Sequence, residues 1–535
     1  MKKLSLMAKL AIIAVLVIVC ILPFTVSAFK GTAWALFPPA VAIILALATK
    51  EVYSSLFIGV LVGALFKTQY KLLATADTIL NDGLITAVKD TAGVFIFLVL
   101  LGMLVALINK TGAAAAFGKW AQSHVKTRIG ATLATFVLGL LIFVDDYFNC
   151  LTVGSVMRPV TDAKKISRAK LAYIIDATAA PVCMIAPISS WAAAVSEYAK
   201  GSQYSGLELF IRAIPFNFYS LLTFVFIIVM ACFKIDFGPM ALHEKNATEK
   251  GDLFTNGGET EEGDKPLENA KGKIIDLIVP VVILIITCIL ALVYVGGILK
   301  ADVGFIQAFS DTDATVGLPL GGIVAIIIAV AYLVCRRVIT YDDAMKAIPE
   351  GFMAMVPAIT ILTLAVSLKN MTGALEAKEY IAKVMQSSAA SLGNFLPAVI
   401  FLVACVLAFA TGTSWGTFGI LIPIVTAIFP GTSPLLIIGM SACLAGAVCG
   451  DHCSPISDTT IMSSAGARCE HINHVSTQLP YAVTVAVFSF IGFLLSGILA
   501  GAAGIKIGIV WCIVFPLMTI LMIAAGFVLK AKTKA

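Results

Sequence analysis

Charged residues are scarce in this sequence. Asp, Glu, Lys and Arg make up 13% of its 535 residues, whereas an ordinary soluble chain is about one quarter charged. Hydrophobic residues reach 60% and gather in runs of roughly 17–25 residues, the length that a helix needs to cross a bilayer. The chain is therefore predicted to be an all-α polytopic membrane protein, because uninterrupted apolar runs exclude the alternating pattern of a transmembrane barrel.

Several common signatures are missing as well. The sequence has neither a GxxxxGK[ST] phosphate loop nor a dinucleotide-binding glycine fingerprint, which argues against direct use of ATP. No run of basic residues is interleaved with aromatics, so nucleic acid is not an expected partner. The twelve cysteines lie mostly inside apolar runs and suggest no disulfide framework. Because no nucleophile stands at a sensible spacing from a base, we expect no enzyme activity.

Apolar segments recur along the whole chain, on both sides of a polar connector. They lie near 9–28, 32–49, 51–68, 93–109, 129–144, 169–195, 208–233, 274–297, 316–335, 351–369, 391–410, 434–450, 480–500 and 505–530. The connector, 235–273, is acidic and glycine-rich and is predicted to be a mobile hydrophilic linker in the cytoplasm. Residues 1–30 are predicted to form an N-terminal transmembrane helix, although they also fit a cleavable signal.

The two halves resemble each other. NKTGA at 109–113 matches NMTGA at 370–374, and APISS at 186–190 matches SPISD at 454–458, which lies 268 positions later. DDYFN at 145–149 stands opposite TSWGT at 413–417 at that same distance. Three matches in one order indicate an internal duplication. The predicted division is a first repeat at 31–234, the linker at 235–273, a second repeat at 274–503, and a C-terminal transmembrane helix with a basic tail at 504–535.

The distribution of lysine and arginine predicts how the halves are oriented. Both ends of the chain are basic and are placed in the cytoplasm, whereas loop 298–315 carries three aspartates against one lysine and is placed outside. These assignments agree only if 129–160 and 396–430 each enter and leave the membrane on one side. The predicted fold has two inverted-topology repeats with re-entrant hairpins, broken helices and about twelve transmembrane helices, a plan common in secondary transporters.

Each half has two places where polar residues interrupt an apolar run. These are FVDDYFNCLTVGS (143–155), DATAAPVCMIAPISSWAA (176–193), ATGTSWGTFG (410–419) and CGDHCSPISDTT (449–460). Pro181, Pro187 and Pro455 predict helix breaks beside these residues, because proline removes an intrahelical donor. A break exposes carbonyls that can bind a cation and half-helix N-termini that can face an anion.

The acids in these stretches are the leading candidates for an ion site. An aspartate at a helix centre costs about 2.5–3.5 kcal/mol on insertion scales, so these acids must face protein, water or a cation. Sodium suits carboxylate, hydroxyl and carbonyl oxygens, and a buried carboxylate can also exchange the ion for a proton. The candidate ion or substrate site comprises Asp145, Asp146, Asn149, Ser189, Ser190, Thr413, Ser414, Asp451, Ser457, Asp458 and Thr459. The predicted sodium ligands among them are Asp145, Asp451 and Asp458.

Structural roles remain the alternative for these residues. Hydroxyl and amide side chains also hold membrane helices together, and Asp451 and Asp458 could be structural partners of His452 or Arg468. His452 fits a proton relay and a structural histidine equally well. The residues that fit structural roles better than functional ones are Asp176, Trp191 and Trp415.

One stretch carries a family resemblance. GDHCSPISDTTIMSSAGARCEHINHVSTQLPYA (450–482) resembles the signature of the NhaC-type sodium/proton antiporter family, and DDYFN to SSW (145–191) is similar to the family's matching segment. The resemblance covers most of the chain and implies an ion-transporter-superfamily fold with two inverted repeats and hairpins. It also implies secondary transport that uses sodium and protons. Carried over position by position, it points to Asp145, Asp146, Asn149, Ser189, Ser190, Asp451, Ser457, Asp458 and Thr459.

The sequence therefore predicts a sodium/proton antiporter in the inner membrane of a bacterium, with no cofactor beyond the transported ions. The alternative is a sodium- or proton-coupled transporter of an organic acid, of the malate/lactate type, or of an amino acid, because some relatives move such solutes. A channel or a membrane-embedded enzyme is a more distant alternative. The expected partners are membrane lipid, sodium and protons, with a small organic solute under the first alternative, and the fold family suggests a homodimer.

Overall fold

The computed structural model shows a helical protein. It describes residues 28–49, 51–113, 124–143, 146–186, 206–255, 271–299, 303–310, 312–377, 392–429 and 433–534, with a few isolated residues between these ranges. Within the described residues, every regular element is a helix. Seven of these helices are long and apolar enough to cross a membrane, or eight if the bent pair Glu208–Phe216 and Phe218–Phe233 is one span. The predicted all-helical membrane protein is confirmed at this level.

The helices follow the apolar segments of the sequence. In the first half they are α2 (Phe37–Thr49), α3 (Val52–Thr68), α4 (Leu72–Asp77), α5 (Thr86–Thr111), α7 (Arg128–Leu141), α8 (Asp146–Ala163), α9 (Arg168–Cys183), α11 (Gly206–Ala213) and α12 (Phe218–Phe233). In the second half they are α14 (Ile275–Val295), α15 (Phe305–Ser310), α16 (Ala314–Cys335), α17 (Tyr341–Ala374), α19 (Leu396–Thr411), α20 (Ser414–Ile428), α21 (Pro434–Cys453), α22 (Asp458–Ala467), α23 (His471–Gly497) and α24 (Ile507–Lys534). Short irregular turns of helix are η1 (Ala33–Leu36), η2 (Thr78–Ile85), η3 (Ile214–Phe216), η5 (Gly393–Phe395) and η6 (Ile498–Ala502).

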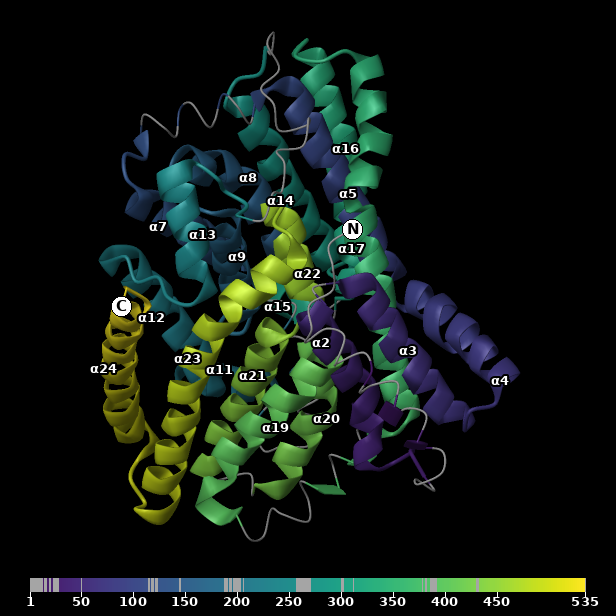
Figure 1. Cartoon of the computed structure of the whole chain (residues 1–535). Helices are drawn as coiled ribbons and strands as arrows, with labels where there is room; N and C mark the ends of the chain where they lie inside the picture. Colours follow the sequence, from purple (N-terminus) through teal and green to yellow (C-terminus); the bar gives the residue numbers. More distant parts are fainter. Residues whose placement is uncertain are drawn as a thin grey trace.

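One group of helices forms a crossed scaffold, on the right in Figure 1. In this group α17 packs against both α3 and α5, and α16 packs against α5 and α14. Glycines allow the α5–α17 crossing to be tight, because a Cβ placed on Gly102 would lie 2.4 Å from the carbonyl oxygen of Gly351. Small residues bring membrane helices together in this way when lipid offers no hydrophobic driving force between them.

The other group surrounds two enclosed helices, α9 and α21. Every residue of α9 is buried, and 89% of the apolar window of α21 is buried, against at most 44% for the other six apolar spans. Helix α21 packs against α19, α20 and α23, while α9 packs against α7, α8, α22 and α23. Both central helices therefore face protein on all sides, which is where polar side chains can be accommodated inside a membrane protein.

Helix starts recur between the halves. Helices α7 and α8 begin at residues 128 and 146, and α19 and α20 begin at 396 and 414, which in both cases is 268 positions later. Helix α9 begins at 168, and α21 at 434, which is 266 positions later. The two halves thus share a pattern of a short helix, a break, a second short helix and a buried central helix.

Two of the proline predictions can be compared with the structure. Pro455 lies between α21 and α22, as predicted, but Pro181 lies inside α9, which continues to Cys183. The prediction of a break at Pro181 was wrong in position, because a proline this close to a helix C-terminus can be accommodated by losing one intrahelical bond before the helix ends. Pro187, like most of residues 1–30, lies outside the described residues.

The first part of the predicted linker is a packed helix, α13 (Pro239–Lys250). It begins with proline at its first position, which suits a helix start, and ends at Gly251 with a φ of 71°. Its Glu244 is buried and accepts hydrogen bonds from Lys170 Nζ at 3.2 Å, from Arg128 and from the backbone N–H of Ser167 at 2.8 Å. This helix therefore joins the ends of α7 and α9, whereas 256–270 lie outside the described residues.

Lys170 is central to this contact and supplies the first prediction. It is buried between Asp236 at 2.8 Å and Glu244 at 3.2 Å, and removing one partner of a buried ion pair costs about 3 kcal/mol or more. We expect Lys170→Met to lower the free energy of unfolding by about that amount in denaturant titrations of purified protein. The matched control is Lys346→Met, because the Lys346–Asp342 pair is 62% and 74% exposed and such pairs contribute about 1 kcal/mol or less. Equal losses for the two variants would contradict the prediction.

Candidate functional site

The chain folds back between α7 and α8. Asn149 Nδ2 donates to the carbonyl oxygens of Gly139 at 2.7 Å and Ile142 at 2.8 Å. In a straight helix residues 139 and 149 would stand about 15 Å apart, so the first turn of α8 must lie beside the last turn of α7. The amide of Asn149 thereby pairs carbonyl groups that the end of α7 leaves without helical partners.

In the second half, a carboxylate from another helix caps the half-helix α20. Thr413 is the N-cap residue, but its side chain caps none of the described amides of α20. Instead Asp451 Oδ2, from the end of α21, accepts from the backbone N–H of Ser414 at 3.1 Å and from the Ser414 hydroxyl at 2.7 Å. The positive end of the α20 dipole stabilises this buried negative charge. The second oxygen, Asp451 Oδ1, is buried and accepts no hydrogen bond from the described residues.

The second acid of the motif stands at the next helix start. Ser457 is the N-cap of α22, with its hydroxyl accepting from the Thr460 N–H at 3.3 Å and lying 3.0 Å from the Thr459 hydroxyl. Asp458 is the first residue of α22; its Oδ1 accepts from the Thr459 N–H at 2.8 Å and its Oδ2 from the Tyr147 hydroxyl at 2.7 Å. Asp451 and Asp458 therefore both lie at helix N-termini.

The two breaks of the second half touch each other. Ser454, in the α21–α22 break, donates from its hydroxyl to the Phe409 carbonyl near the end of α19 at 2.7 Å. Gly412, in the α19–α20 break, has a φ of 64°, and a Cβ there would lie 2.4 Å from the Ile456 carbonyl oxygen. Only glycine fits this approach without strain. The contact brings exposed backbone carbonyls and the carboxylate of Asp451 into one region of the protein.

Contacts between the halves are reciprocal. Tyr147, the second residue of α8, reaches Asp458 in the second half. The residue 268 positions after Tyr147 is Trp415, the second residue of α20, and its ring packs on Trp191 of the first half with centroids 5.7 Å apart. Since Trp191 and Asp458 also stand at nearly equivalent positions, 267 residues apart, each half places the start of its half-helix against the same part of the other half.

The structure brings together only some of the residues that the sequence singled out. Ser414 joins Asp451, and Ser457 joins Thr459, while Asn149 serves the fold-back of α7 and α8. Asp146 is fully buried at the start of α8, one residue before Tyr147. The predicted residues outside the described part of the chain are Asp145, Ser189 and Ser190.

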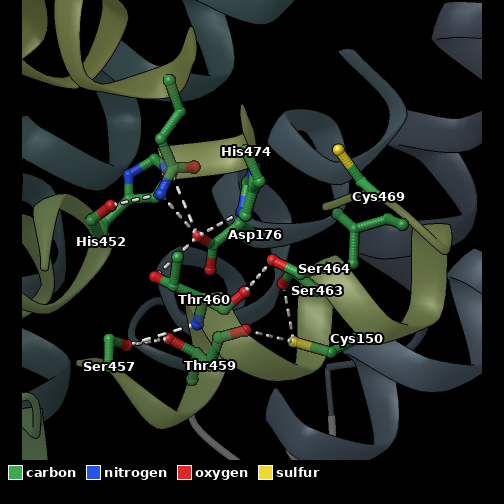
Figure 2. Close-up of polar contacts among 12 residues, drawn as sticks. Cys150, Asp176, His452, Ser457, Thr459, Thr460, Ser463, Ser464, Cys469 and His474 are labelled. Atoms are coloured by element: carbon green, nitrogen blue, oxygen red, sulfur yellow. Dashed lines mark hydrogen bonds and ion pairs between the residues drawn. The ribbon is translucent and has the colours of Figure 1, made fainter. Parts of the chain in front are cut away.

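The main residue that the sequence undervalued is Asp176 of α9. Its Oδ2 accepts hydrogen bonds from Thr460 Oγ1 at 3.0 Å, Gln478 Nε2 at 3.0 Å and His474 Nε2 at 3.2 Å. His452 Nε2 lies 4.0 Å from the same oxygen. Figure 2 shows these side chains converging on Asp176, with Ser457 and Thr459 on the neighbouring turn of α22. The sequence signal was present, as the DAT of 176–178 in a polar stretch, but nothing local identified its partners.

This arrangement is suited to binding small cations. The described residues contain no group of three or more His, Cys, Asp or Glu side chains able to hold a metal ion, so no tightly held transition metal is indicated there. Carboxylate, hydroxyl and backbone carbonyl oxygens are instead the ligands that hard cations take, and at the α20–α22 breaks they occur together.

Comparisons with known proteins give a consistent result. The model of the Na+/H+ antiporter family matches residues 190–498. An uncharacterised protein of Haemophilus influenzae is 37% identical over 503 residues, which cover 90% of this chain and 95% of that protein. The malate-2H+/Na+-lactate antiporter of Bacillus subtilis is 27% identical over 212 residues, covering 38% and 44%. An uncharacterised Na+/H+ antiporter of Haemophilus influenzae is 29% identical over 154 residues, covering 28% and 32%.

Asn149 yields the second prediction. Replacing it with Leu leaves two buried carbonyls at the end of α7 without their donor, and each such group costs about 1–3 kcal/mol. We expect Asn149→Leu to destabilise the purified protein by about 2–4 kcal/mol in denaturant unfolding. The equivalent position in the second half, Thr417, bonds only to the Thr413 carbonyl of its own helix, so Thr417→Val should cost about 1 kcal/mol or less. A larger loss at Thr417 than at Asn149 would contradict the assigned role.

Proposed function

The chain belongs to the Na+/H+ antiporter family, and from this premise we propose that it exchanges sodium ions for protons across a bacterial inner membrane. The family and the named relatives are antiporters, so a secondary transporter rather than an enzyme is the class at hand. The identity of the exchanged ions is our proposal. It rests on one observation: two acids, Asp451 and Asp458, stand at the N-termini of half-helices inside a protein-enclosed part of the bundle.

Asp451 is the residue we assign to direct ion binding. Its Oδ2 is held by Ser414, while its buried Oδ1 accepts no hydrogen bond from the described residues. A buried carboxylate oxygen without a donor is costly unless a proton or a cation neutralises it. Sodium would be held by this oxygen together with hydroxyls and carbonyls of the neighbouring breaks. Asp458 adds a second negative charge within electrostatic reach of Asp451.

Exchange follows if the same carboxylates hold either ion but not both. Two close carboxylates favour binding of a positive charge, and once sodium is bound the attraction for a proton is reduced. An empty, doubly charged site would be costly to move through an apolar environment. Movement of a loaded site from one side to the other then couples the two fluxes without ATP.

The proposed architecture is a pair of inverted repeats, 31–234 and 274–503, within about twelve membrane spans and with both termini in the cytoplasm. The equal spacing of helix starts and the reciprocal contacts Tyr147–Asp458 and Trp415–Trp191 support a two-fold relation between the halves. Such repeats place broken helices at the membrane midplane, where one unit can move against another. The basic ends and the linker 235–273 lie on the cytoplasmic side in this scheme.

A second candidate is exchange that carries an organic acid. The Bacillus subtilis relative is named a malate-2H+/Na+-lactate antiporter. Beside Ser414, the indole N–H groups of Trp191 and Trp415 are buried and donate to no acceptor among the described residues. A buried indole N–H usually finds a partner, and a carboxylate solute would supply one. This candidate predicts transport that depends on an added acid.

Proteoliposomes separate the two candidates. Purified protein is reconstituted with a pH-sensitive dye inside, and a sodium gradient is imposed with no organic solute present. Proton movement against the sodium gradient under these conditions supports sodium/proton exchange. Movement that requires malate, lactate or an amino acid refutes it in favour of the second candidate, and Trp415→Phe should then weaken the response to the solute.

The third prediction concerns the acids themselves. Asp451→Asn and Asp458→Asn each keep the side-chain shape but remove a charge, so we expect sodium-driven proton flux to fall to the level of protein-free vesicles. Asp342→Asn is the control, because Asp342 is exposed and pairs with Lys346 at the start of α17. Equal amounts of each variant in the membrane must be shown by gel filtration. Wild-type flux in correctly folded Asp451→Asn protein would refute the assignment.

A further inference from the structure

Asp176 lies outside the proposed ion site and is enclosed by protein. It is 1% exposed, in the middle of α9, and its two carboxylate oxygens differ sharply. Oδ2 accepts from Thr460, Gln478 and His474, whereas Oδ1 is buried and accepts no hydrogen bond from the described residues. One oxygen is therefore fully occupied, and the other is left for a ligand.

The side chains around Asp176 repeat this pattern. His474 Nδ1, Gln478 Oε1 and His452 Nε2 are each buried without a hydrogen-bond partner among the described residues. His474 is 0% exposed and Gln478 is 0% exposed. Nearly all buried polar atoms in proteins are hydrogen-bonded, and an exception requires an explanation. Four such atoms in one cluster point to a site whose occupancy changes.

The charged and titratable groups that face this cluster come from several elements. They are Asp451, His452 and Cys453 from α21, Asp458 from α22, His471 and His474 from α23, Tyr219 from α12 through His452, Tyr147 and Cys150 from α8 through α22, and Arg128 of α7 with Glu244 of α13 at the far end of α9 near Lys170. No lysine or arginine donates a hydrogen bond to Asp176 in the described residues. Its charge is thus balanced by neutral donors and by histidines rather than by a fixed cation.

Comparison of the halves argues against a purely architectural role. The position 268 residues after Asp176 is Leu444 in α21, and the position 268 residues before Gln478 is Phe210 in α11; both are buried and apolar. The duplicated architecture therefore forms without these polar groups. The second half of the structure has an apolar core where the first half carries an acid.

We propose that Asp176 is a proton-binding site of the transport cycle, separate from the cation site at Asp451 and Asp458 and coupled to it through space and through α22. One proton adds to Oδ1 and converts the carboxylate to a neutral carboxylic acid, with no other bond made or broken. The proton leaves to water when a cation is bound next to it. This inference rests on the proposed exchange of a cation for protons and deepens it by locating a second proton.

Two routes couple the sites. Asp176 and Asp451 are within electrostatic reach of each other, so a sodium ion at Asp451 weakens the attraction of Asp176 for a proton. The first turn of α22 also connects them, because Asp458 and Thr460 stand on the same turn and Thr460 donates to Asp176. Binding that shifts this turn changes the donors that hold the Asp176 carboxylate. By linkage, a proton bound at Asp176 must weaken sodium binding by the same factor.

The fourth prediction is tested on the full-length protein in detergent. Sodium binding is followed through sodium-induced thermal stabilisation over a range of pH, and the logarithm of the apparent sodium Kd is plotted against pH. Each proton displaced by sodium adds one unit to the slope, so Asp176→Asn should reduce the slope by about one. His471→Gln is the matched control, since His471 lies on the same helix but bonds to the Pro455 carbonyl and the Ser464 hydroxyl instead. An unchanged slope in Asp176→Asn would overturn the proposal.

A second measurement does not depend on sodium. Infrared difference spectra between acid and alkaline pH report the carbonyl stretch of protonated carboxylic acids, and Asp176→Asn should lose one such component that His471→Gln keeps. Thr460→Val should move the pH midpoint of that component, and Thr460→Ser should restore it, because serine keeps the donor. If wild-type protein shows no sodium response, the proposed exchange fails while the infrared component still decides whether Asp176 binds a proton. A spectrum of Asp176→Asn identical to the wild type refutes the proton site.

Discussion

A carboxylate buried among apolar helices must have its charge stabilised by something other than water, and in this chain that stabilisation comes from the ends of broken helices. Asp451 receives the first amide and hydroxyl of α20, and Asp458 stands at the first turn of α22. An unbroken helix offers no free amides at its centre, because each is already bonded to a carbonyl four residues back. The breaks at 412–413 and 454–457 are therefore what makes an acid tolerable at these positions. Without them, a chain this poor in charge would be expected to lack acids there.

The duplicated halves use equivalent positions for different chemistry. Position 146 starts the half-helix α8 with an aspartate, while the equivalent position in α20 is Ser414. The acid that partners Ser414 is Asp451 of α21, and the equivalent residue of α9 is Cys183, 268 positions earlier. The acid has thus changed places within a shared framework. Asp176 goes further, because its equivalent is a leucine. We infer that duplication supplied the breaks and that later substitutions made the two halves chemically unequal.

The packing separates helices that hold ions from helices that hold the molecule together. Helices α9 and α21 are enclosed by protein, and every polar contact described for the candidate site ends on them or on the short helices beside them. The crossed scaffold of α3, α5, α16 and α17 instead meets through glycines and apolar side chains. Two separately packed groups with a polar region at the edge of one of them suit a transporter in which one group moves against the other.

The sequence by itself determined the class of protein and most of its long helices, because hydrophobicity is a property of each residue and a run of apolar residues needs no partner to be recognised. It also marked the four polar interruptions and the repeat. It did not reveal helices α8, α13 and α22, which are too polar for that signal, and it misplaced the break near Pro181. Only the tertiary structure decided which polar atoms meet: Ser414 finds Asp451 from 37 residues away, and Thr460 and Gln478 find Asp176 from 284 and 302 residues away. A hydrogen bond depends on distance and direction between groups, and these are set by the packing of the whole bundle rather than by neighbours in the chain.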